Sequence, residues 1–139
     1  MNFMKEAWLE ELSSWLQNAG YERFDEKFEG FGDLRIRFVG RACQVVVGRE
    51  KLQWYICLAP RGGDPVMLPR IWQGYLDGID PDPESPASLE SNLSFVYDRL
   101  EEVASAAERD TEIGQKLRAI NRKVILARLR LGPDLRRLD

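Results

Sequence analysis

The stretch LRIRFVGRACQVVVGREKLQWYICL, residues 34–58, decides the fold of this chain. From Leu34 to Phe38 apolar side chains alternate with arginines, which is the period of a β-strand that buries one face. Gly40-Arg41 fits a two-residue hairpin loop with glycine first, and Arg49-Glu50 fits the next loop. Nearly all the large aliphatic side chains of three strands then share one face, and a one-residue slip would scatter them. The stretch therefore predicts a three-stranded antiparallel meander.

In these registers Phe38 lies opposite Cys43, and Val45 lies opposite Trp54. Polar side chains gather on the other face, with Val46 and Cys57 among them: Arg35, Arg37, Gln44, Gln53 and Tyr55. Basic and amide groups around a tyrosine are typical of a surface that contacts nucleic acid or protein. The same composition suits an ordinary solvated face, on which arginine stems cover apolar side chains. The sequence leaves both interpretations open.

Helical periodicity flanks the predicted sheet on both sides. Residues 4–19 carry an apolar stripe that includes Trp8 and Trp15, which predicts a helix docked on the sheet through both tryptophans. A short helix is expected from Pro69 to Leu76, because proline suits the first helical position. Residues 21–32 fit either a short strand or an irregular crossover.

The longest periodic region begins at Ser85-Pro86, with serine as the N-cap. Its seven-residue apolar repeat runs from Leu89 to Ala107, breaks near residues 109–112 and restarts at Ile113. We expect two helices, an acidic one and a basic one, packed as an antiparallel hairpin with matched charges. The repeat would also suit the seam of a homodimer.

Together these segments predict a single α+β domain over residues 1–131, followed by a short tail over 132–139. The expected order is an N-terminal helix, a three- to four-stranded antiparallel meander and a C-terminal antiparallel helical hairpin. With 139 residues, the chain has the length of one compact domain.

Histidine is absent from the sequence, and there are two cysteines. Without imidazole there is no Ser-His or Cys-His nucleophile pair and no histidine metal ligand. Two cysteines also complete neither a zinc site nor a disulfide framework, and Cys43 and Cys57 fall on opposite predicted faces. The composition therefore predicts a protein that is not an enzyme and holds no metal or cofactor.

The net charge of −3 conceals four alternating blocks. Residues 1–34 carry −5, residues 35–70 carry +5, residues 71–112 carry −9, and residues 113–139 carry +6. The blocks either neutralise one another in the fold or leave an acidic face that captures a basic partner.

An acidic loop, DGIDPDPE, lies within the −9 block. Its prolines and spacing do not match a calcium-binding loop. We expect its carboxylates to form the partner-binding surface, so that charge reversal there slows association with a basic protein: Asp77, Asp80, Asp82 and Glu84.

The N-terminal helix ending at Ala19-Gly20-Tyr21, the meander ending in WYICL at residues 54–58 and the helices that follow carry a resemblance. In a small acidic chain without catalytic residues, this order resembles the immunity proteins of bacterial polymorphic-toxin systems. The resemblance implies a cytoplasmic protein that neutralises a toxin domain by stoichiometric binding, without a membrane anchor. This chain is less similar to type III secretion chaperones. Those chaperones have further strands after the middle helix, whereas residues 86–131 of this chain are predicted to be helical throughout. Nucleic-acid binding through the cationic sheet face is the remaining alternative.

Overall fold

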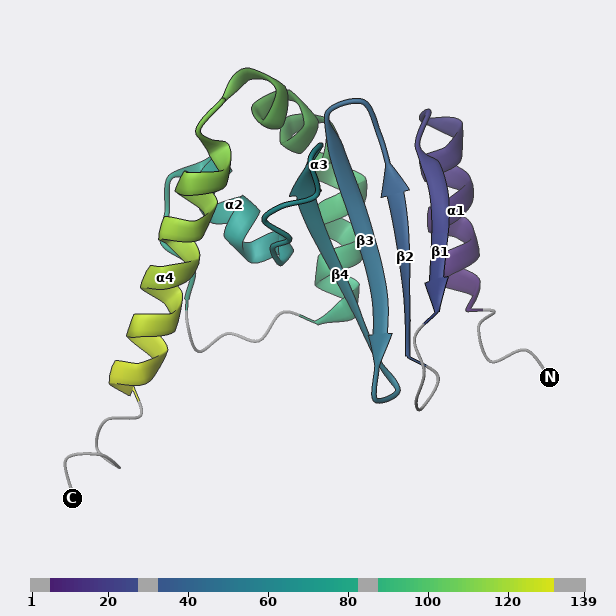
Figure 1. The fold of residues 1–139 in the computed structure, drawn as a ribbon. Coiled ribbons are helices and arrows are strands. Elements are labelled where there is room, and N and C mark those ends of the chain that lie inside the picture. Colours follow the sequence, from purple (N-terminus) through teal and green to yellow (C-terminus); the bar gives the residue numbers. More distant parts are fainter. Residues whose placement is uncertain (1–5, 28–32, 83–87, 132–139) are drawn as a thin grey trace.

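The computed structural model describes residues 6–27, 33–82 and 88–131 (Figure 1). One helix, four strands and three further helices follow one another along the chain: α1 (Ala7–Asn18), β1 (Glu22–Lys27), β2 (Leu34–Val39), β3 (Cys43–Glu50), β4 (Gln53–Pro60), α2 (Pro69–Asp77), α3 (Leu89–Arg109) and α4 (Ile113–Leu131). The strands form one antiparallel sheet in the order β1-β2-β3-β4. The predicted α+β class, with its N-terminal helix, antiparallel meander and adjacent C-terminal helices, is confirmed.

Both predicted hairpin registers are wrong by an even number of residues. Phe38 pairs with Val45 instead of Cys43, and Val45 pairs with Leu58 instead of Trp54. The second turn falls at Lys51-Leu52, because this register pairs two buried strands along their whole length. Since side chains alternate with a period of two, the even shifts leave every residue on its predicted face.

The inner face of the sheet is covered by α1 and α3, which lie behind the strands in Figure 1. Aliphatic and aromatic side chains from both helices and from β2, β3 and β4 fill this core: Leu9, Leu12, Leu16, Ile36, Phe38, Val45, Val47, Ile56, Leu58, Val96, Leu100 and Val103. The seven-residue repeat of α3 is thus buried within the chain itself.

The short helix α2 lies at the β4 edge of the sheet, between α3 and α4 (Figure 1). Its Trp72 is fully buried, and the indole Nε1 donates a hydrogen bond of 3.0 Å to the Leu58 carbonyl. α4 runs back alongside α2 after a tight turn at Asp110. Within the described residues, the charges of α4 are matched by other elements rather than by α3: Lys116 pairs with Asp110 in the turn, and Lys123 pairs with Asp80 at 3.7 Å.

The two tryptophans of α1 have different surroundings. Trp8 packs edge-on against Trp54 with ring centroids 5.2 Å apart, as expected for a helix docked on the sheet. Trp15 instead points to the junction between α1 and α3 and remains 37% exposed. Its predicted place in the sheet contact is wrong, because its ring packs against Tyr97 of α3. Among the described helices, none is long and apolar enough to span a bilayer.

Candidate binding surfaces

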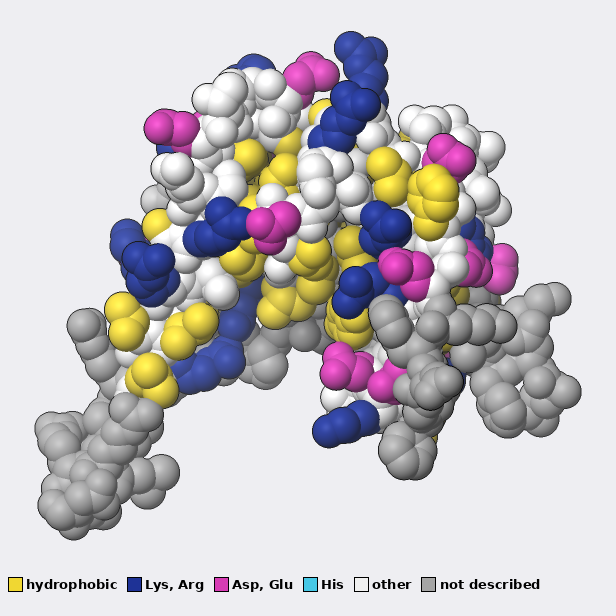
Figure 2. All heavy atoms as spheres, viewed as in Figure 1, with side chains coloured by type: hydrophobic (Ala, Val, Ile, Leu, Met, Phe, Trp, Pro, Cys, Tyr) yellow, Lys and Arg dark blue, Asp and Glu magenta, His cyan; other side chains and the backbone are white. Residues whose placement is uncertain are grey.

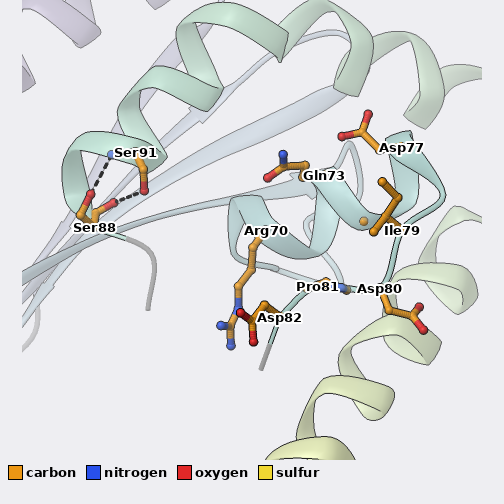
Figure 3. A pocket seen from close by; sticks show the side chains of 10 residues that line it. Arg70, Gln73, Asp77, Ile79, Asp80, Pro81, Asp82, Ser88 and Ser91 are labelled. Carbon is orange, nitrogen blue, oxygen red and sulfur yellow. Dashed lines mark hydrogen bonds between the residues drawn. The ribbon is translucent and has the colours of Figure 1, made fainter. Parts of the chain in front are cut away.

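Three of the four residues predicted to bind a partner line one cavity, of about 590 Å³, between α2 and the start of α3 (Figure 3). Asp77 comes from the last turn of α2, and Asp80 and Asp82 come from the segment that follows it. Arg70 and Ser88 line the same cavity. The fourth predicted residue, Glu84, lies outside the described residues.

These carboxylates are already engaged by cations of the same chain. Arg99 donates two hydrogen bonds to Asp77, at 2.8 and 2.9 Å, and they lower the pKa of that carboxyl. Asp80 lies 3.7 Å from the Lys123 ammonium on α4. Asp82 lies beside the Arg70 guanidinium; burial, followed by the charge of Arg128, lowers the pKa of Arg70, and the charge of Asp82 opposes this shift. The acidic loop therefore ties the linker after α2 to neighbouring helices.

The second predicted surface is the outer face of the sheet, and its residues are also brought together. Four of them line a cavity of about 290 Å³ with Val46, Val66 and the backbone of Gly62-Gly63: Arg35, Arg37, Gln44 and Tyr55. Gln44 is buried and donates to the Arg61 carbonyl at 2.8 Å. The Tyr55 ring lies over Gly48, where any larger residue would clash with it. Gln53 stands apart, paired with Glu50 at the end of the hairpin.

The strand β1 changes the charge of this outer face. Its pairing with β2 sets Phe24 beside Arg37, and Glu26 beside Arg35. Glu26 accepts a hydrogen bond of 3.0 Å from Arg37 Nε, and the Arg37 guanidinium lies over the Phe24 ring. The sequence did not decide between a strand and an irregular crossover for residues 21–32, so the position of Glu26 on this face was not predicted. The face is a mixed polar surface, and a polyanion approaching it meets repulsion as well as attraction.

Neither thiol is available for chemistry on this face. Cys57 is buried beneath the outer surface, and burial raises its pKa to about 12. Cys43 lies in the core 3.3 Å from the Tyr21 hydroxyl, and burial raises its pKa as well. Both sulfur atoms are therefore protonated at neutral pH and behave as small apolar groups.

A third surface, which the sequence did not indicate, lies where Trp15 of α1 meets Tyr97 of α3. Trp15 and Tyr97 contact each other with ring centroids 4.8 Å apart and ring planes tilted by 59°, and the two residues are 37% and 38% exposed. Glu11 precedes Trp15 by one helical turn, and Glu101 follows Tyr97 by one turn, so each carboxylate lies on the same side as its aromatic neighbour. We call Glu11, Trp15, Tyr97, Asp98 and Glu101 the acidic–aromatic patch.

The carboxylates of this patch differ from those of the acidic loop. Glu11, Asp98 and Glu101 are exposed, and none has an ion-pair partner within the described part of the chain. Burial, followed by the charge of Glu11, raises the pKa of the Tyr97 hydroxyl. α1 and α3 together carry seven carboxylates against two arginines. One of these, Arg99, is held by Asp77 and Glu102. The patch is thus the centre of an acidic surface with free negative charge.

The opposite side of the molecule is basic. α4 contains six lysines and arginines and no carboxylate. Figure 2 shows their side chains along α4, with apolar side chains at its lower end and in the hollow beside the sheet. Three of the cations reach other elements: Lys116 contacts Asp110, Arg118 contacts Asp64, and Lys123 contacts Asp80. The fold therefore neutralises part of the charge blocks and separates the remainder onto two sides.

No known protein family, curated protein or solved structure matches this chain.

Proposed function

We propose that this protein is a non-catalytic binding module that neutralises a basic protein, such as a toxin domain, by stoichiometric contact. This is the manner of action of an immunity protein. The acidic–aromatic patch carries the proposal, because it combines exposed aromatic rings with carboxylates that have no partner of their own in the described chain.

Tryptophan and tyrosine are the residue types that most often dominate the binding energy of a protein interface. Trp15 and Tyr97 already support each other, so their rings lose little conformational freedom when a partner covers them. A partner that packs on both rings removes their remaining exposed area from water, which favours association.

The surrounding carboxylates favour a cationic partner. Glu11, Asp98 and Glu101 would accept hydrogen bonds from lysine or arginine side chains placed around the aromatic centre. Charges at the rim of an interface mainly accelerate encounter and exclude partners of the same sign. A toxin domain with a basic active-site cleft has the complementary charge.

The acidic loop has a lesser part in this proposal than the sequence suggested. Asp77 and its neighbours in the loop are neutralised by arginine and lysine side chains of the same chain. A partner would have to displace those cations before it could pair with the carboxylates.

The experiment is a calorimetric titration with the purified domain encoded by the gene next to this one. We expect a 1:1 complex, and we expect the double variant Trp15→Ala, Tyr97→Ala to bind at least 100-fold more weakly, since two central aromatic side chains are lost. Asp80→Asn with Asp82→Asn is the matched control and should bind within a few-fold of the wild type.

Two results would overturn the proposal. One is a neighbouring protein that does not bind at all. The other is a complex that tolerates loss of both aromatic side chains while circular dichroism shows the variant to be folded.

A further inference from the structure

We propose that this protein also associates with itself head to tail, with the C-terminal half of α4 from one copy seated on the acidic–aromatic patch of the next. The two surfaces lie at opposite ends of one molecule: α1 is at one edge of the sheet and α4 is beyond the other (Figure 1). The inference does not require the partner of the proposed function, although it uses the same patch.

α4 carries an apolar strip that is exposed among the residues the structure describes. Ile113, Leu117 and Val124 are buried against the domain, whereas Ile125, Leu126 and Leu129 are 50%, 46% and 43% exposed. Leu129 follows Ile125 by four residues and Leu126 by three, so both lie next to Leu129 on the helix surface and the three form one continuous apolar strip. Arg122 precedes Leu126 by one turn and has no ion pair within the described residues. We call Arg122, Ile125, Leu126 and Leu129 the basic–aliphatic strip.

The positive charge of this strip favours contact with an acidic surface over contact with a second α4 helix. If two α4 helices packed on each other through it, arginine and lysine side chains of both copies would face one another, which is unfavourable. The acidic–aromatic patch has the opposite charge, and its apolar centre matches the aliphatic side chains of the strip. The acidic–aromatic patch of a second copy therefore matches the strip in both charge and apolar character.

The geometry of such a contact determines the kind of assembly. Because different surfaces of the two copies meet, the contact is heterologous, and each complex keeps one free patch and one free strip. The few side chains involved place the contact at the small end of protein interfaces, below about 1,200 Å². We expect weak, salt-sensitive association that continues beyond the dimer as the protein concentration rises.

This association would compete with any basic partner for the patch. A tight partner would dissolve the assembly by covering Trp15 and Tyr97, so that the free protein and the complex differ in oligomeric state.

Sedimentation equilibrium of the full chain tests the inference with two variants that each remove one surface. Glu11→Lys with Glu101→Lys removes the patch, and Leu126→Glu with Leu129→Glu removes the strip; all four side chains are exposed. We expect the wild type to increase in average mass with concentration and each variant alone to be monomeric. A mixture of the two variants should form 1:1 dimers and nothing larger, because only one productive contact remains. Ile79→Glu, which changes an exposed aliphatic side chain elsewhere, should associate like the wild type.

Three outcomes would overturn the inference: a wild type that stays monomeric at every concentration, a patch variant that still dimerises through α4, or a mixture of variants that stays monomeric. The strip variant also separates this inference from the proposed function. It retains the patch, so it should still bind the basic partner as the wild type does, whichever way the sedimentation experiment ends.

Discussion

At the scale of single residues, Asp110 joins three interactions at the turn between α3 and α4. Its carboxylate accepts hydrogen bonds from the Tyr75 hydroxyl at 2.6 Å, from the Lys116 ammonium at 2.8 Å and from the Glu112 backbone amide at 2.9 Å. The bond from Lys116, followed by those from Tyr75 and Glu112, lowers the pKa of Asp110 from 3.8 to about 2. A single carboxylate therefore joins α2, α3 and α4.

This pKa gives a pH-dependent prediction. A carboxyl whose pKa is lower in the folded protein stabilises it above the unfolded value, and the contribution is lost as the pH falls. We expect Asp110→Asn to be less stable than the wild type at pH 7, with the difference shrinking below about pH 4 and vanishing below about pH 1. Urea unfolding across this range measures it. Asp98→Asn, at an exposed carboxylate without a partner in the described chain, should show no such pH-dependent difference; an equal effect there would contradict the assignment.

At the scale of elements, the faces of the strands followed from the sequence, but their turns did not. The period of two in β2, β3 and β4 is set by local alternation, which the sequence contains directly. The turns depend on which strands pair over their full length, and Lys51-Leu52 offers no glycine or asparagine to indicate a turn. β1 was left undecided because its residues other than Phe24 are polar, so no face of the strand is apolar throughout.

The acidic–aromatic patch escaped prediction for a related reason. Trp15 shares the apolar stripe of α1 with buried leucines, so its exposure depends on how far α1 lies from α3. Tyr97 directly follows the buried Val96, and only the packing of two helices far apart in sequence shows that it meets Trp15. Of the predicted sites, the sequence grouped the members of the acidic loop and the outer face largely correctly. It could not show which cations neutralise them.

The β3–β4 turn gives a prediction for this scale. Lys51 and Leu52 both have positive φ angles, 51° and 67°, which are unfavourable for residues other than glycine and asparagine. Replacing the pair by Asn-Gly should raise the unfolding free energy by about 1–2 kcal/mol, because the exposed Leu52 contributes little packing. Thermal unfolding would show this as a higher midpoint. The same replacement at Arg41-Ala42, where neither φ is positive, should give no gain. A Lys51-Leu52 replacement that lowers the midpoint would contradict the argument.

At the scale of the whole molecule, the net charge is only −3, but the fold places acidic and basic side chains on opposite sides. Ion pairs connect the charge blocks where they meet, as in Glu26–Arg37, Arg41–Glu108 and Asp80–Lys123. Within the described residues, carboxylates without an ion pair gather on α1 and α3, and Arg122 on α4 is a cation without one. The fold thus decides which charges of each block reach a partner.

This separation predicts how a basic partner should find the protein. In stopped-flow association with the partner domain, Glu11→Lys with Glu101→Lys should lower the association rate constant by roughly tenfold at low salt, because it reverses free charges beside the binding surface. The effect should fade as salt shortens the Debye length. Asp80→Lys with Asp82→Lys makes the same change in net charge, but it also releases Lys123 and Arg70, which already neutralise that loop. If steering depended on net charge alone, both variants would slow association equally. If the rate constant falls most for Glu11→Lys with Glu101→Lys, the partner first meets the protein at α1 and α3.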